Sequence, residues 1–337
     1  MRESSPQLAP PLLPDARGPL SADLLTVLRS GTGSRLGLPV VAEPWGDDAQ
    51  LALYLCYELH YHGFAGVEPE LEWDPAVLAF RRELERAFLT ALRADAGAVA
   101  DVDTELAGLL VEPLDAPGPS HYLLDQGQRW QVREYLAHRS LYQLKEADPH
   151  IWVVPRLQGQ AKASMVAVQY DEYGAGRGEH VHALLYAQMM TAFGLDPGYG
   201  RYLDVVPAVT LATVNVMSLF GLHRALRGAL VGQFAVLEIT SPPGAERLLR
   251  AVSRFDGSAA ATRFYDEHVE ADAVHEQLVR RGVIGGLLAT EPDLAPDIAF
   301  GIRAAVLLED RLGENLVAAW RAGRSSLRHP LDDGPPG

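Results

Sequence analysis

The stretch FYDEHVEADAVHEQLVRRG, residues Phe264–Gly282, decides the fold class of this chain. It places His268, Asp272 and His275 at steps of four and three residues, and such steps return to nearly the same side of an α-helix. The two imidazoles and the carboxylate therefore share one helical stripe with apolar residues, and this stripe should face a core. Ionisable groups in a core are costly unless they are paired or bind a metal. The stretch predicts a helical protein with a buried metal site.

Glu146 and Glu238 are candidate carboxylate ligands in two other apolar helical segments. Glu146 lies near the end of the predicted helix 127–147, and the alternative interpretation is an ion pair with Arg139 or Lys145. Glu238 follows ten uncharged residues in the segment ALVGQFAVLEITSPP, and its alternative is to reach solvent from the helix end. Residues just beyond Glu146 that compete for its role are Asp148 and His150.

Glu172 and His182 flank the break DEYGAGRGEHVH, whose glycines must interrupt the helix. Glu172 aligns with the apolar face of its own segment, and His182 shares a face with Leu185. Neighbours that compete with these two are Asp171, Glu179 and His180, and a solvent-exposed Glu172 paired with Arg177 is a further alternative. The seven candidates for one metal site are therefore Glu146, Glu172, His182, Glu238, His268, Asp272 and His275.

The remaining sequence predicts an all-α chain, because strand-type alternation is almost absent. Residues 1–20 are rich in proline and are expected to form a flexible arm, followed by an N-terminal helical region at 21–120, the main helical domain at 121–325 and a disordered tail at 326–337. Gly282 is expected to cap the helix that carries the metal stripe. Predicted helices span about 21–30, 47–62, 75–95, 102–111, 127–147, 159–172, 179–194, 207–222, 224–239, 244–253, 258–281 and 295–321.

The composition favours a soluble, cytoplasmic protein without nucleic-acid or membrane partners. The 337 residues carry a net charge of −15, whereas a nucleic-acid-binding protein should present a basic face. The single cysteine, Cys56, excludes an intramolecular disulfide framework and a cysteine-rich zinc site. The N-terminus lacks the apolar core of a signal peptide. The longest uncharged run, Val205–Leu222, contains Pro207 and Asn215 and is expected to be a buried core helix rather than a membrane span.

The order of the candidate ligands on an all-α chain resembles the heme-oxygenase-like diiron oxidases and oxygenases, whose longer members are called iron-containing redox enzymes. Segments that carry the resemblance are SLYQLKEADPH, TLATVNVMSLFGLHRALRGALVG and FYDEHVEADAVHEQL. The resemblance covers about residues 121–325 and implies a heme-oxygenase-like helical bundle, with 21–120 as additional N-terminal helices. The six core ligands of that family match Glu146, His182, Glu238, His268, Asp272 and His275.

The resemblance implies two Fe(II)/Fe(III) ions held between the helices, O2 as a cosubstrate, and no heme. N-oxygenating members carry one more carboxylate on the helix before the core histidine, and Glu172 matches its place best. All seven candidates are then metal ligands and together form the catalytic site. Imidazole and carboxylate donors of mixed geometry also suit iron on chemical grounds.

Three functions follow as hypotheses. The first is an O2-dependent oxygenase that oxidises the nitrogen of a small amine or guanidine-like metabolite in natural-product biosynthesis. The second is a diiron oxidase that cleaves or desaturates an amino or fatty acid, and the third is a non-catalytic iron-binding helical protein. The expected partners are a small-molecule substrate, an electron donor or reductase, and a second copy of the chain.

Four arginines lie in or beside the apolar segments and offer a clamp for a substrate carboxylate, because a guanidinium pairs with a carboxylate through two hydrogen bonds. Ion pairs with nearby acids are the favoured interpretation, since arginine is the usual cation of partly buried ion pairs. These residues are Arg139, Arg156, Arg224 and Arg227.

Overall fold

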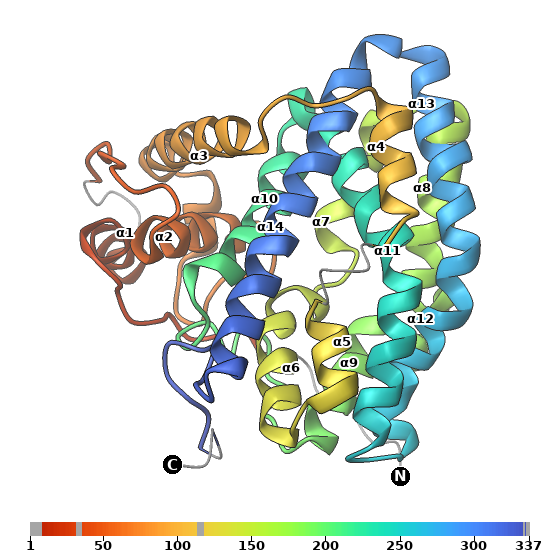
Figure 1. Ribbon diagram of the computed structural model, residues 1–337. Helices are drawn as coiled ribbons and strands as arrows, with labels where there is room; N and C mark the ends of the chain where they lie inside the picture. Colours follow the sequence, from red (N-terminus) through yellow and green to blue (C-terminus); the bar gives the residue numbers. More distant parts are fainter. Residues whose placement is uncertain (1–8, 32–35, 113–117, 333, 335–337) are drawn as a thin grey trace.

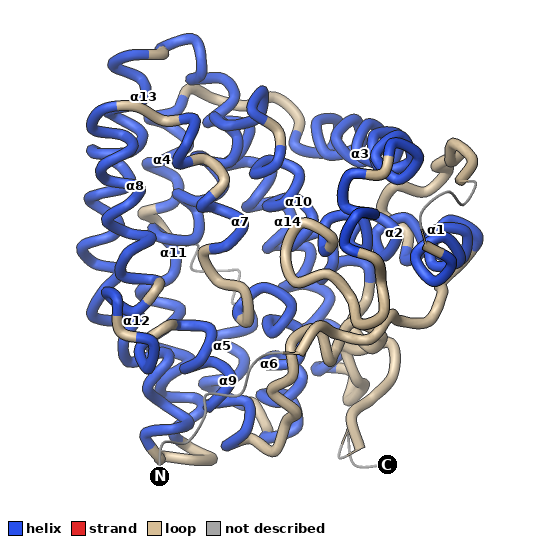
Figure 2. The backbone as a smooth tube through the Cα atoms, turned by 180° about the vertical axis from the view of Figure 1, so that it is seen from behind, coloured by secondary structure: helices blue, strands red, loops and turns tan. Residues whose placement is uncertain are grey.

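The described chain is helical, and the predicted all-α class is confirmed. The computed structural model describes residues 9–31, 36–112, 118–332 and 334, with the side chains of 270–274 left out. No strand occurs in these ranges, as the tube trace shows (Figure 2). The α-helices are α1 (Pro19–Ser30), α2 (Asp47–Glu58), α3 (Pro75–Ala96), α4 (Val102–Leu109), α5 (Pro119–Gln126), α6 (Arg129–Gln143), α7 (Asp148–Ile151), α8 (Gly159–Glu172), α9 (His182–Ala192), α10 (Ala208–Leu222), α11 (Arg227–Ser253), α12 (Ala259–Gln277), α13 (Gly285–Thr290) and α14 (Ala295–Arg321).

Helix α11 packs between α12 and α14 and organises the bundle (Figure 1). Its contact with α14 depends on two glycines. A β-carbon at Gly232 would lie 2.0 Å from the carbonyl oxygen of Ile298, and one at Gly301 would lie 2.0 Å from the carbonyl oxygen of Ala229. Because no β-carbon tolerates such a distance, only glycine allows the two backbones to approach this closely.

The sequence predicts two helices separated at Pro242 and Pro243, whereas α11 continues through both prolines. A proline inside a helix removes its own hydrogen bond to the carbonyl four residues earlier. The carbonyls of Glu238 and Ile239 therefore lack their usual intrahelical partners. Packing against α12 and α14 on both sides of this point keeps the helix continuous, which periodicity alone does not reveal.

The predicted cap at Gly282 is wrong. Helix α12 passes into a π-helix, Leu278–Ile284, and then into α13, so the chain stays helical beyond the glycine. A β-carbon at Gly282 would lie 2.1 Å from the hydroxyl oxygen of Ser164 on α8. Glycine is required here for close packing against α8 and not to end a helix.

Helices α1–α3 form a layer on one side of the bundle (Figures 1 and 2). Helix α2 packs against α10, and α3 packs against α14. A buried ion pair joins this layer to the bundle, because Lys145 donates to Glu58 over 2.9 Å and both side chains are almost fully buried. Helices α4 and α5 pack on α11 and α14.

The segments predicted as a flexible arm and a disordered tail are partly packed against the bundle. Pro11 and Pro14 are buried, and so are Ser326 and Leu327. The amide of Ser326 donates to the carboxylate of Glu134 over 2.9 Å. The packed chain therefore extends past residue 326.

The uncharged run Val205–Leu222 is largely α10, a core helix whose Asn215 donates to the backbone and side chain of Gln50. The predicted burial of this run is confirmed. Within the described ranges, no single helix has the length and apolarity needed to cross a membrane. Among the described helices, the pair Ala208–Leu222 and Arg224–Ser253 has that length and apolarity only when the two are taken together, and the pair is bent by 108° at the break.

Candidate metal centre

The candidate residues come from the ends of three helices and the middle of two. Glu172 is the last residue of α8 and His182 the first of α9, while Glu238 lies within α11. Glu146 lies in the turn after α6, and Ala147 directly behind it has a φ of 75°. Residues with a side chain rarely adopt this conformation, so the backbone is strained at the candidate ligand.

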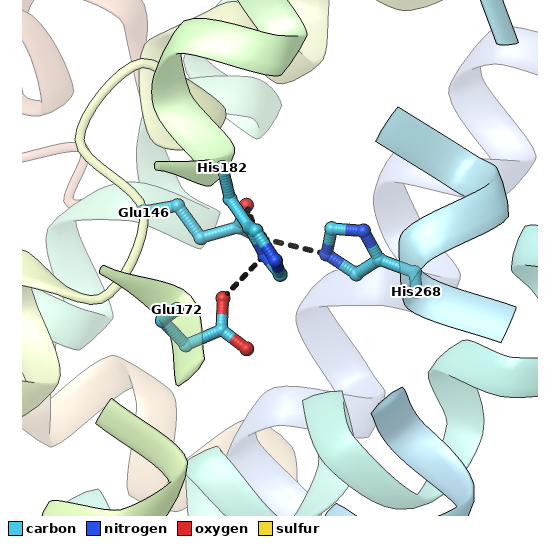
Figure 3. A group of neighbouring side chains, drawn as sticks. All are labelled: Glu146, Glu172, His182 and His268. Atoms are coloured by element: carbon cyan, nitrogen blue, oxygen red, sulfur yellow. Dashed lines mark ion pairs between the residues drawn. The ribbon is translucent and has the colours of Figure 1, made fainter. Parts of the chain in front are cut away.

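The first group of donors is formed by Glu146, Glu172, His182 and His268, which offer ligand atoms that all lie within 4.8 Å of one another (Figure 3). Nδ1 of His182 lies 2.8 Å from Oε2 of Glu172 and 3.7 Å from Oε2 of Glu146. Nε2 of His268 lies 3.6 Å from Oε1 of Glu146. Four donors from four separate segments therefore converge on one point.

The second group is formed by Glu172, Glu238 and His275, again with ligand atoms within 4.8 Å of one another. Nδ1 of His275 lies 3.2 Å from Oε2 of Glu238 and 3.7 Å from Oε1 of Glu172. Glu172 thus belongs to both groups, with Oε2 facing His182 and Oε1 facing His275. One carboxylate joins two adjacent donor sets.

The structure brings six of the seven predicted residues together. The seventh, Asp272, lies on α12 between His268 and His275, but its side chain is outside the described residues. Its predicted role stays a prediction.

The alternatives for Glu146 and Glu238 do not apply in this structure. Arg139 pairs with Glu309 instead, through hydrogen bonds of 2.9 and 2.6 Å, and Lys145 pairs with Glu58. Glu238 is only 7% exposed, so it does not reach solvent.

Most competing residues are engaged elsewhere. His150 bonds to Gln233 over 2.8 Å, and Tyr173 donates to Asp148 over 2.9 Å. His180 contacts Arg263, and Glu179 is exposed. Asp171 remains a neighbour of the second group, because its carboxylate lies 3.2 Å from Nε2 of His275, although it is about half exposed.

Burial and the attraction between opposite charges act against each other in the first group. Burial raises the pKa of Glu146. Burial would also raise the pKa of Glu172, but the imidazoles of His182, His268 and His275 outweigh it and hold this pKa at about 2. Burial would lower the pKa of His182, but attraction to Glu172 raises it. The site therefore favours a positive charge beside these carboxylates.

The donors fit a metal ion. Oε2 of Glu146 and Nδ1 of His182 are buried and make no hydrogen bond with suitable geometry. Nδ1 of His182 nevertheless lies close to Oε2 of Glu172 and to Oε2 of Glu146. Nδ1 of His268 donates to the carbonyl of Phe264 over 2.7 Å, so Nε2 is left with its lone pair toward Glu146. Buried imidazole and carboxylate atoms with lone pairs aimed at one point suit iron or manganese.

A cavity of about 510 Å³ reaches both groups of donors. It runs from Glu146, Glu172 and Glu238 to the Arg139–Glu309 pair and on to the α4–α5 region. Two further polar residues on its wall, Gln143 and Gln169, were not singled out from the sequence. A signal is present there, because each glutamine precedes a candidate glutamate by three residues and so shares its helical face.

No curated protein matches this chain. A family model described as iron-containing redox enzyme matches residues 133–310, a range that includes every candidate ligand. Since this range is more than half of the chain, the protein belongs to the iron-containing redox enzyme family.

Proposed function

We propose that this protein is a non-heme diiron oxygenase that uses O2 to oxidise a nitrogen atom of a small amine or guanidine-like metabolite. The observation that carries the proposal is the Glu172 carboxylate, whose two oxygen atoms face two different donor groups. A carboxylate shared between two donor sets suits a site for two adjacent metal ions. Membership of an iron-containing redox family supports iron as the metal.

In this proposal, each donor group would hold one iron. Glu146, His182 and His268 would hold the first, and Glu238 and His275 the second, with Glu172 available to both. Asp272 is assigned to the centre from the sequence. The four carboxylates Glu146, Glu172, Glu238 and Asp272 then balance the four positive charges of two ferrous ions. When bound, the ions supply electrons to O2 and open coordination positions for it.

The protein keeps the centre dry and its ligands oriented. His182, His268 and His275 are at most 7% exposed. The ring of Phe264 lies 4.3 Å from that of His268 and 6.2 Å from that of His182, between centroids. Such packing fixes the imidazoles and excludes water from the reacting atoms.

The charge of the cavity supports a cationic substrate over a fatty acid. Six carboxylates line it among the described residues, and three of them would be balanced by the irons. Glu309 is paired with Arg139 and Glu112 with Arg247, so Asp310 is the lining carboxylate left without a counter-charge. A carboxylate without a counter-charge attracts an amine or guanidinium and repels the carboxylate of a fatty acid. The acidic residues on the wall are Glu112, Glu146, Glu172, Glu238, Glu309 and Asp310.

The proposed reaction also requires an electron donor. Converting an amine and O2 into a hydroxylamine and water consumes two electrons and two protons. The amine gains one oxygen atom and the other leaves as water, so a reductase or small reductant must restore the ferrous state before the next turnover.

Two measurements test the proposal. Protein loaded with ferrous iron without oxygen should contain about two irons per chain, and a panel of amines should raise its O2 uptake with a reductant present. Products should carry one added oxygen atom on nitrogen, seen by mass spectrometry with ¹⁸O2. An iron content of one or less per chain would refute the diiron centre. O2 uptake that no amine or guanidine stimulates would refute N-oxygenation.

A further inference from the structure

Two glutamine side chains in the cavity have polar atoms that the described protein does not satisfy. Gln169 is 2% exposed, and among the described residues neither its amide nitrogen nor its amide oxygen has a hydrogen-bond partner. The amide oxygen of Gln143 is buried and unpartnered in the same way. Because buried polar groups are normally hydrogen-bonded, these atoms are available to a bound molecule.

Both glutamines lie beside the candidate metal centre. Gln169 precedes Glu172 by three residues on α8, and Gln143, the last residue of α6, precedes Glu146 by three residues. All four residues line the same cavity. The two amide oxygens accept hydrogen bonds and suit the N–H groups of a ligand, whereas the amide nitrogen of Gln169 donates and requires an acceptor.

The wall of the cavity carries a second feature on α6 and α14. Arg139 lies four residues before Gln143 on α6, which is about 6 Å along the helix. Its guanidinium is bound by both oxygens of Glu309 and is not available to a substrate carboxylate. Asp310 lines the cavity next to Glu309, and no described residue forms a hydrogen bond or ion pair with it.

We propose that the cavity selects a linear molecule with a cationic nitrogen group at each end, of which Gln143 and Gln169 bind the end beside the metal centre and Asp310 binds the far end. This inference rests on the proposed function, since it names the residues that would present a nitrogen atom to the centre. Diamines and guanidino-amines are the substrate class.

Agmatine and arginine form a matched pair of probes, because they differ only in the α-carboxylate. Calorimetry under nitrogen with ferrous protein measures binding without turnover. Agmatine should bind at least about tenfold more tightly than arginine, since the one guanidinium on the described wall is already bound by Glu309 and leaves the added carboxylate without a partner. Equal or tighter binding of arginine would overturn the proposal and indicate a carboxylate clamp instead.

Substitutions then locate the two ends of the ligand. Gln169→Met keeps the side-chain volume and should weaken agmatine binding about tenfold, and Gln143→Met should act in the same direction. Asp310→Asn should weaken agmatine binding about threefold, less than a buried charge would, because Asp310 is exposed. Matched controls are Gln160→Met on α8 and Glu314→Gln on α14, exposed residues that do not line the cavity.

The stability of the variants separates a ligand-binding role from a structural one. Removing an unsatisfied buried amide should leave the melting temperature of Gln169→Met equal to or above that of wild type. Unchanged agmatine binding in both methionine variants would overturn the assignment of the glutamines. Iron content is measured on the same samples. A wild-type protein that holds about two irons per chain but does not prefer agmatine refutes this inference alone. A wild-type protein that holds one iron or less per chain refutes the proposed function.

Discussion

Replacing Glu172 with alanine tests the central feature of the candidate site, which is one carboxylate shared by two donor groups. Its oxygens lie 2.8 Å from His182 and 3.7 Å from His275. Glu172→Ala should therefore weaken the binding of both metal ions, while Glu146→Ala and His275→Ala should each weaken the binding of one. Iron content per chain should fall from about two to below one in the first variant and to about one in the others.

The loss of metal-dependent stability follows from mass action. At free iron a hundredfold above the dissociation constant, each ion adds about 2.7 kcal/mol to the free energy of unfolding, and a site weakened a hundredfold adds only about 0.4 kcal/mol. Glu172→Ala should then lose about 4.6 kcal/mol of this stabilisation, and His275→Ala about half as much. An unfolding entropy of about 2.1 cal/mol/K per residue over 337 residues converts these losses into about 6 °C and about 3 °C.

The assay compares thermal melts of each variant with and without ferrous iron under nitrogen. Taking the difference for each protein removes any effect of the substitution on the metal-free state. Glu179→Ala provides the matched control, because Glu179 is an exposed carboxylate in the neighbouring loop. An iron-dependent shift in Glu172→Ala as large as that in His275→Ala would show that Glu172 serves one metal only, and an unchanged shift would show that it serves none.

Three further predictions concern stability. Burial, with a smaller contribution from a neighbouring arginine, lowers the pKa of His138 to about 3, so the folded protein keeps this ring neutral while the unfolded chain protonates it near pH 6.5. The free energy of unfolding should therefore fall as pH drops below about 6.5, and His138→Asn should reduce that slope by up to about 1.4 kcal/mol per pH unit in urea titrations. Lys145→Met leaves the buried carboxylate of Glu58 without its cation and should cost about 3–5 kcal/mol in urea unfolding, of which the double variant with Glu58→Gln should recover a part. Gly232→Ala places a β-carbon 2.0 Å from a backbone oxygen and should lower stability by about 1–3 kcal/mol, whereas Gly244→Ala has open space and should melt close to wild type.

Helix bounds followed from the sequence where the chain carries a clear local signal. Helix α8 spans the predicted residues 159–172, because glycines lie at both ends, and α14 spans the predicted 295–321. Helix α6 ends at Gln143 and not at the predicted 147. The turn that follows depends on Ala147 at positive φ, and alanine gives no sequence signal for that conformation.

The membership of the site was more predictable than its division into two groups. Helical spacing aligned His268 and His275 on one stripe, which suggested a single site. Seven residues of helix also separate two side chains by about 10 Å along the axis, so the two histidines reach different donor groups. The double role of Glu172 depends on the direction of a side chain at a helix end, and no periodicity encodes that direction.

Residues outside the family match help to hold the site. The match begins at residue 133, yet Glu58 on α2 binds Lys145, the residue directly before Glu146. Tyr199 also donates to Glu58, so this carboxylate is satisfied from two sides in a fully buried position. The turn that carries Glu146 is therefore held on one side by an N-terminal helix and on the other by the strained backbone of Ala147. Since the α4–α5 region also lines the cavity, the N-terminal residues contribute to the position of a candidate ligand and to the wall that a substrate would meet.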